Sequence, residues 1–370
     1  MHVSFYNYKR MNDFLRQDIR REFEKLFFLD SDKKVFQYMY TNERKIGRVL
    51  GPGYSIGTES GTAALQFALT SLGVRQNDEV ITVSNTNVST LHSISALGAI
   101  PTLVDVKEDT MLMDIGLLEE AITERTRAII PVHLYGQMVD MRSIQKIARK
   151  HGLFVVEDAC QSHLARYAGE RPGTRSDAVA YSFFLNKRFS GFGGGLVTTK
   201  RRFVYKQIEF MRNPFYHTPT VLKSLRSPSY LNALDISTIF AKLRHMDKWM
   251  QSCRSVAKRY YEGLSSTPLI LPGVDPKAHH TFLFFTVRDK NRNRLRRYLR
   301  WRGIESVIWY PDPNHLYEPY KRLGYPEGSL PITERICATR LCLPINPFLT
   351  DDEVDYVIKT VKGFYRSSFF

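Results

Sequence analysis

The sequence predicts an α/β protein with a mainly parallel sheet and a second, smaller lobe. From residue 60 to residue 185, apolar runs typical of strands alternate with helical stretches and short polar links. This alternation indicates parallel strands with helices on both faces of the sheet. A chain of 370 residues is also long enough to form two lobes.

The expected elements can be placed in order by their apolar periodicity. The larger lobe has a helix over 63–72, strands at 80–83, 101–105, 128–132, 153–157 and 178–184, and helices near 88–97, 115–123 and 140–150. A polar helical region at 235–262 could connect the lobes. A strand at 281–287 and a basic helix at 291–302 follow; in that helix Leu295 and Leu299 stand four apart and can pack while the arginines face water. We therefore expect a large domain over residues 1–240 and a smaller α+β domain over 241–370.

Two of these strands lead into residues with complementary chemistry. Asp158 directly follows the run 153–157, and Lys187 follows the run 178–184. Ligands of parallel α/β sheets bind at the carboxyl ends of strands. A carboxylate and an amine delivered there suit pyridoxal phosphate (PLP), which needs a lysine for its Schiff base and an acid for its pyridinium nitrogen. Taken alone, Lys187 could be an ordinary surface lysine and Asp158 a helix N-cap.

The spacing of these residues resembles the DegT/DnrJ/EryC1/StrS family of PLP-dependent aminotransferases. The shared stretches are Glu157-Asp158-Ala159-Cys160-Gln161-Ser162-His163 and Ser182-Phe183-Phe184-Leu185-Asn186-Lys187, with further matches at 60–65, 131–137, 310–316 and 343–346. The resemblance covers roughly residues 40–365 in the right order; the first 40 residues match poorly. It implies PLP fold type I, with PLP bound by the large domain. It also implies transfer of an amino group, with glutamate as the expected donor, to a keto sugar, nucleotide-linked in most relatives.

The resemblance assigns roles around the cofactor ring. It makes Lys187 the Schiff-base lysine, and a buried amine near other cations would have the lowered pKa that this role needs. It places Asp158 against the pyridinium N–H and Gln161 within reach of the phenolic oxygen. Asn87 stands at the position that faces the ring. His163 and His315 are substrate candidates, although a structural histidine would explain each equally well.

The phosphate group has its own expected set of residues. Ser60-Gly61-Thr62 opens a helix, where backbone amides and the helix dipole favour an anion, although the same tripeptide is a common N-cap. In the resemblance, Ser182 supplies a further hydroxyl. Asn232 matches the asparagine that reaches the phosphate of the neighbouring subunit, which implies a homodimer with two shared sites.

Three departures from the family pattern concern the cofactor and substrate positions. Asn87 replaces an aromatic residue that stacks on the pyridine ring, an interaction of about 0.5–1.5 kcal/mol beyond its buried area. Gly193 stands where relatives often have an acidic residue, and residues 27–34 replace the usual N-terminal substrate segment.

Two other functions stay open on the same scaffold. One is a sugar dehydratase or oxidase, although dehydratases of this type use histidine where this chain has Lys187. The other is a catalytically silent, PLP-binding regulatory protein, which Asn87 and Gly193 favour and the intact Asp158, Gln161 and Lys187 disfavour.

The net charge of +16 is concentrated at 200–226 and 288–302. A solvated helix face explains such clusters, attraction of a polyanionic nucleotide sugar is the next alternative, and no nucleic-acid-binding motif accompanies them. The chain has no 18-residue apolar run, no signal-peptide pattern and no catalytic-metal motif, and its four cysteines show no ligand spacing. We therefore expect a cytoplasmic protein with free thiols, no metal, no membrane span and no nucleic-acid partner.

Overall fold

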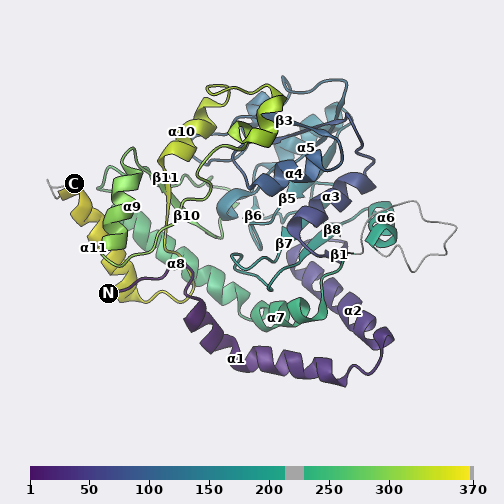
Figure 1. The fold of residues 1–370 in the computed structure, drawn as a ribbon, viewed down its shortest axis with the longest axis horizontal. Helices are drawn as coiled ribbons and strands as arrows, with labels where there is room; N and C mark the ends of the chain where they lie inside the picture. Colours follow the sequence, from purple (N-terminus) through teal and green to yellow (C-terminus); the bar gives the residue numbers. More distant parts are fainter. Residues whose placement is uncertain (213–228, 367–370) are drawn as a thin grey trace.

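A seven-stranded sheet lies at the centre of the computed structural model, which describes residues 1–212 and 229–366 (Figure 1). The strand order is β1–β8–β7–β5–β4–β2–β3. The strands are β1 (Tyr54–Thr58), β2 (Glu79–Val83), β3 (Ile100–Val104), β4 (Thr126–Ile129), β5 (Phe154–Asp158), β7 (Ala178–Ser182) and β8 (Gly195–Thr199). All neighbours from β3 to β7 are parallel, whereas β8 runs antiparallel to both β7 and β1. The mainly parallel sheet is therefore confirmed.

Alternate residues of the central strands face two different cores. In β2 and β5, Ile81 and Val155 belong to one apolar cluster, while Val80 and Val156 belong to another. Neighbouring side chains of a strand point to opposite faces. The sheet is thus buried on both sides, which explains why its strands are continuous apolar runs.

The helices of the larger part flank this sheet. They are α1 (Tyr8–Glu24), α2 (Asp32–Leu50), α3 (Gly61–Ser71), α4 (Val88–Ser95), α5 (Met141–Lys150), α6 (Arg202–Arg212) and α7 (Ala233–Leu243), with short 3-10 turns η1 (Lys25–Phe28), η2 (Ile115–Leu117) and η3 (Leu134–Gly136). In Figure 1, α1 lies along the lower edge of the molecule, and it packs mainly on α7. This arrangement leaves the carboxyl ends of β5 and β7 facing the loops that precede α3 and α4.

The C-terminal part forms a second core. It contains α8 (Met246–Leu264), α9 (Arg292–Trp301), α10 (Pro331–Thr339), α11 (Asp351–Arg366), the 3-10 turns η5 (Asn314–Leu316) and η6 (Glu318–Leu323), and the antiparallel pair β10 (Phe285–Arg288) and β11 (Arg340–Leu343). A two-residue pair, β6 (Arg166–Tyr167) and β9 (Ala278–His279), links the two parts. Leu295 and Leu299 of α9 are fully buried, while Arg296 and Arg300 are exposed, as the periodicity predicts.

The N-terminal residues pack into this second core. Val3 is fully buried in the cluster that otherwise spans residues 253–364. Figure 1 shows the N-terminus beside α11, the last described helix. We propose that the residues after about 240 form the smaller domain together with the first residues of the chain. The residues between these two parts form the larger domain.

Three of the expected elements differ from the structure. The helix expected near 115–123 is wrong: only η2 forms, and Leu118, Ala121 and Ile122 donate to carbonyls three residues back, which makes a series of tight turns. The region 235–262 is two helices, α7 and α8. The strand expected over 281–287 begins only at Phe285, because the carbonyls of Thr281 and Phe282 accept from the buried Arg188 instead of a neighbouring strand.

None of the helices in the described part of the chain has the length and hydropathy of a membrane span. The four cysteines are free thiols. Within residues 1–212 and 229–366, no group of three or more His, Cys, Asp or Glu side chains is arranged to hold a metal ion.

Candidate active site

A cavity of about 300 Å³ lies at the carboxyl ends of β5 and β7. Its walls come from the start of α3, the loop before α4, the segments after β5 and β7, and Trp309 of the smaller part. Eight of the eleven residues predicted for the site line this cavity: Ser60, Gly61, Thr62, Asn87, Asp158, Gln161, Ser182 and Lys187. Predicted residues from four separate segments of the sequence are therefore brought together.

Lys187 is held on a tight turn that follows β7. Its backbone N–H donates to Phe184 O at 2.8 Å, and the side chain is only 9% exposed. Burial lowers the pKa of Lys187, against the opposing influence of Cys160 and Asp158. Among the described residues, no hydrogen bond or ion pair engages its amine. A neutral, unpaired amine is the form in which a lysine attacks an aldehyde.

Asp158 is fixed by two hydrogen bonds at the end of β5. Its Oδ2 accepts from Thr90 Oγ1 at 2.8 Å, and its Oδ1 accepts from the Cys160 backbone N–H at 3.1 Å. Thr90 lies in α4, one helical turn from Thr86, and the two hydroxyls are 2.9 Å apart. The carboxylate is thus oriented from two sides while it still lines the cavity.

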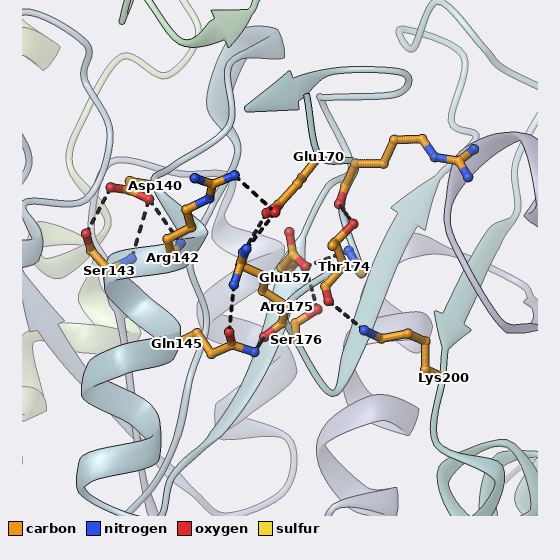
Figure 2. A network of polar contacts seen from close by, with 12 residues as sticks. Asp140, Arg142, Ser143, Gln145, Glu157, Glu170, Thr174, Arg175, Ser176 and Lys200 are labelled. Atoms are coloured by element: carbon orange, nitrogen blue, oxygen red, sulfur yellow. Dashed lines mark hydrogen bonds and ion pairs between the residues drawn. The ribbon is translucent and has the colours of Figure 1, made fainter. Parts of the chain in front are cut away.

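The preceding residue of β5, Glu157, points away from the cavity. It is fully buried, and it accepts from Gly173 N at 2.7 Å and from the Ser176 hydroxyl. On its other side, His133 Nε2 lies 2.7 Å from Glu157 Oε2. Figure 2 shows Glu157 within the polar network that orders the loop 170–176, beside the Glu170–Arg175 ion pair. Glu157 therefore anchors that loop, and Asp158 is the carboxylate that β5 offers to the cavity.

Ser60, Gly61 and Thr62 form the N-terminus of α3 against the cavity. Ser60 is the N-cap, and its hydroxyl accepts from Ala63 N at 3.1 Å. The first amides of a helix have no intrahelical acceptor and attract anions. A Cβ at Gly61 would lie 2.7 Å from Ser182 Cβ and 2.8 Å from Cys160 Sγ. Only glycine therefore lets this helix start approach the Ser182 hydroxyl, which forms the cradle that a phosphate requires.

Gln161 is oriented by two tyrosines. Its Oε1 accepts from Tyr135 N at 3.0 Å, and its Nε2 donates to Tyr310 Oη at 2.7 Å. Burial raises the pKa of Tyr310, and a hydrogen bond with Asn87 opposes that rise. Asn87 itself caps α4, where its Oδ1 accepts from Ser89 N at 2.9 Å. Asn87 thus contributes to the polar wall of the cavity, while Phe184 and Trp309 supply aromatic surface.

The residues of this cavity fit PLP. A buried amine, a fixed carboxylate, an oriented amide and an anion-binding helix start converge on one space, and these are the groups that the aldehyde, ring nitrogen, phenolic oxygen and phosphate require. Cys160 adds a thiol whose pKa burial raises well above its ordinary value, so it is not a competing nucleophile.

Two predicted substrate residues do not line the cavity. His163 lies behind it, stacked between Tyr181 and Phe183 at ring distances of 5.9 and 5.8 Å, and burial lowers its pKa to about 3. The fully buried His315 contacts Ser84 Oγ at 2.8 Å and Glu334 Oε1 at 3.1 Å. His315 thus has the contacts of a structural histidine, whereas His163 packs among aromatic rings and its Nε2 has no partner among the described residues.

Asn232 is also outside the cavity of its own chain. It is exposed at the start of α7, where its Oδ1 accepts from Asp235 N at 2.9 Å and its Nδ2 donates to Asp235 Oδ2 at 2.6 Å. Asp235 also accepts from the backbone of Phe192 and of Gly193. A side chain at Gly193 would start 3.8 Å from Asp235 Oδ2, so an acidic residue there would add a second carboxylate beside Asp235.

The N-terminal segment 27–34 and the two basic clusters do not line the cavity in the described part of the chain. Phe27 and Phe28 are 87% and 80% exposed at the turn between α1 and α2. None of the described basic residues of 200–226 or 288–302 lines the cavity, and several are paired, as Arg201 is with Asp177, Arg212 with Glu43 and Arg288 with Glu108. Lys223 and Arg226 fall outside the described residues.

Several lining residues were not predicted from the sequence. Thr90 and Trp309 contact the cavity, and Tyr310 reaches Gln161. Thr90 stands one helical turn after Thr86, but this spacing alone did not connect it to Asp158. Tyr310 belongs to a segment that carries the family resemblance, but nothing in the sequence connected it to Gln161.

Known proteins resemble this chain over most of its length. A sequence profile described as the DegT/DnrJ/EryC1/StrS aminotransferase family matches residues 28–362. The dTDP-3-amino-3,4,6-trideoxy-alpha-D-glucose transaminase of Micromonospora megalomicea subsp. nigra is 38% identical over 92% of this chain and 95% of its own length.

Solved structures agree with the fold. A crystal structure of S. venezuelae DesV in complex with a ketimine intermediate has a TM-score of 0.93 and 33% identity, and the match covers 99% of both chains. The ntda protein of Bacillus subtilis, with bound cofactor PMP, has a TM-score of 0.88 and 26% identity over 99% of this chain and 86% of that one. The expected fold of PLP-dependent aminotransferases is thus confirmed. The chain belongs to the DegT/DnrJ/EryC1/StrS family of aminotransferases, enzymes that use PLP.

Proposed function

We propose that this protein transfers an amino group from glutamate to a keto sugar linked to a nucleoside diphosphate. The observation that carries the proposal is the buried, unpaired amine of Lys187, which lines the same cavity as the doubly hydrogen-bonded carboxylate of Asp158. The Micromonospora relative, named as a dTDP-amino-sugar transaminase, supports the substrate class.

Within this function, each group of the cavity has a role. When bound, PLP acts as an electron sink that lets an amino group leave the donor and enter the acceptor. Lys187 would hold the cofactor, and its free amine would carry a proton to and from the reacting carbon of the amino donor. Asp158 would keep the ring nitrogen protonated, and Gln161 would contact the phenolic oxygen. The start of α3 and the Ser182 hydroxyl would bind the phosphate.

We also propose that the active unit is a homodimer. Asn232 is exposed near the Gly191–Gly194 turn and contacts no part of its own cavity, which suits a residue that completes the phosphate site of a second subunit.

Two half-reactions test the proposed function. Glutamate, added to the PLP form, should convert the cofactor absorbance to that of the pyridoxamine form. A dTDP-linked 3-keto or 4-keto sugar should then restore the original spectrum and yield an amino sugar, which mass spectrometry can identify. Lys187→Ala is the matched control and should do neither. Conversion by glutamate without recovery by any keto sugar would contradict the acceptor class, and failure of both steps would contradict the transaminase function.

A further inference from the structure

The N-terminal segment, residues 3–8, is held against the lysine side of the cavity. Val3 pairs with Ile304 in an isolated bridge, Phe5 N donates to Glu305 Oε2 at 2.8 Å, and Asn346 Nδ2 donates to Phe5 O at 3.1 Å. Val3 and Phe5 are buried. These contacts fix the position of the residues that follow, and this segment lies outside the region where the family profile matches.

This anchoring places Tyr6 beside two residues of the active-site cavity. Trp309, which lines the cavity, donates from Nε1 to Tyr6 Oη at 3.2 Å. The side chain of Asn186, next to Lys187, also lies close to this phenol and lowers its pKa, against the larger effect of burial. Burial raises the pKa of Tyr6 to about 12, so the phenol keeps its proton at neutral pH.

A smaller cavity of about 40 Å³ adjoins the active-site cavity at this point. Tyr6 lines the smaller cavity, and Asn186 and Lys187 line both. One water occupies about 30 Å³ in the liquid. The smaller cavity therefore has room for at least a small polar group such as a hydroxyl.

Two polar groups at this junction have unused hydrogen-bonding capacity. Asn186 Oδ1 is buried and has no partner among the described residues. The Tyr6 oxygen accepts from Trp309, and among the described residues its own O–H finds no acceptor. A buried polar group without a partner is costly, so such groups mark places where a ligand or water binds.

The chemistry of this pair favours a hydroxyl group. Tyr6 offers a donor and Asn186 offers an acceptor, and an alcohol is both acceptor and donor. A carboxylate only accepts, so a carboxylate of the amino donor placed here would leave Asn186 Oδ1 without a partner. We propose, on the basis of the proposed sugar aminotransferase function, that Tyr6 and Asn186 together bind one hydroxyl group of the acceptor sugar next to Lys187 and so determine which sugar is accepted.

Binding of unreactive nucleotide sugars to the PLP-loaded protein tests this proposal. The ligands are dTDP-glucose and its 2-, 3-, 4- and 6-deoxy analogues, and calorimetry gives the affinities. One of the deoxy analogues should bind the wild type about 3–10-fold more weakly than dTDP-glucose, the effect of one lost hydrogen bond. Tyr6→Phe and Asn186→Ala should bind dTDP-glucose as weakly as that analogue and should no longer distinguish the two.

Tyr8→Phe is the matched control. Tyr8 stacks on Tyr6 at 5.3 Å, but it is 41% exposed and its phenol donates to Leu185 O at 3.4 Å. This variant should keep the wild-type discrimination. The rate of the glutamate half-reaction gives a second readout. The fold-change of this rate in Tyr6→Phe should be smaller than the fold-loss of its affinity for dTDP-glucose.

Three results would overturn the proposal, and they have different meanings. If the wild type discriminates but Tyr6→Phe and Asn186→Ala discriminate equally well, the pair binds water or serves folding, and the proposed function stands. If Tyr6→Phe slows the glutamate half-reaction as much as it weakens sugar binding, the pair serves the donor. If the wild type binds none of the nucleotide sugars, the proposed function fails as well.

Discussion

The hydroxyl of Thr90 donates a 2.8 Å hydrogen bond to Oδ2 of Asp158, and both side chains are buried. The donor comes from α4 and the acceptor from the end of β5, so the contact joins two walls of the cavity. It fixes the direction in which the carboxylate points. A carboxylate can accept a hydrogen bond from a ring nitrogen only if it points towards it.

Thr90→Val keeps the shape of this side chain and removes its hydroxyl. Because hydrogen bonds to charged groups contribute about 1.5–3 kcal/mol, the glutamate half-reaction should slow by about 10-fold or more. Single-turnover absorbance measurements give this rate, and equilibrium dialysis gives the affinity for PLP. A rate within two-fold of wild type would mean that Thr90 does not orient Asp158.

Asp158→Asn should keep the fold and the bound cofactor but lose nearly all transamination. An amide cannot hold the ring nitrogen protonated, so the stabilisation of developing charge is lost, and the half-reaction should slow by about 100-fold or more. Glu157→Gln is a poor substitute as a control, because Glu157 anchors the loop 170–176. The better control is Asp140→Asn at the N-cap of α5, because asparagine keeps the capping oxygen and Asp140 does not line the cavity. Near-normal turnover by Asp158→Asn would show that Asp158 does not face the ring.

The parts of the site that the sequence predicts are those tied to strand ends and to helix starts. Asp158 and Lys187 follow apolar runs, and Ser60-Gly61-Thr62 precedes a helix, so periodicity alone places them near one edge of the sheet. Thr90, Tyr310 and Tyr6 could not be placed in this way. Their roles depend on tertiary contacts across 68, 149 and 303 residues of chain, which periodicity does not encode.

His163 shows that closeness to a motif in the sequence does not place a side chain in the site. His163 directly follows the cofactor-binding motif in sequence, yet the strand and turn direct its ring into the aromatic cluster behind β7. Proximity in sequence therefore gave no information about the direction of the side chain. The helix expected near 115–123 differs for a related reason, because Gly116 and the bonds to residues three back favour tight turns over an α-helix.

His163→Phe should change the pH dependence of stability and leave catalysis intact. Burial lowers the pKa of His163 to about 3 in the folded protein, from the ordinary histidine value of about 6.5. Between these values the unfolded chain binds a proton that the folded protein does not, so stability falls as pH falls from about 6.5 towards 3, by up to about 1.4 kcal/mol per pH unit. The variant should lose this part of the slope, while His280, which is shifted in the same direction, keeps its own.

Urea unfolding at several pH values between 7 and 5 measures this slope, and steady-state assays give kcat/KM. An unchanged slope together with a ten-fold loss of kcat/KM would place His163 in contact with substrate instead.

Hybrid dimers test the shared site. Lys187→Ala and Asn232→Ala subunits should each be nearly inactive alone. Mixed by unfolding and refolding, they should recover about a quarter of wild-type activity, because half of the dimers are hybrids and each hybrid has one intact site. Asn232→Ser is the control for the lost helix cap, since it keeps a capping oxygen but shortens the reach of the side chain. A fully active monomer in analytical ultracentrifugation would contradict the dimer.

The attachment of the cofactor to Lys187 is the central claim, and peptide mass spectrometry of the borohydride-reduced protein tests it most directly. Reduction should fix one pyridoxyl group on the peptide that contains Lys187, and the yellow absorbance should disappear with it. The Lys187→Ala variant should give no such adduct. An adduct on any other lysine of the wild type, with Lys187 unmodified, would contradict this account of the site.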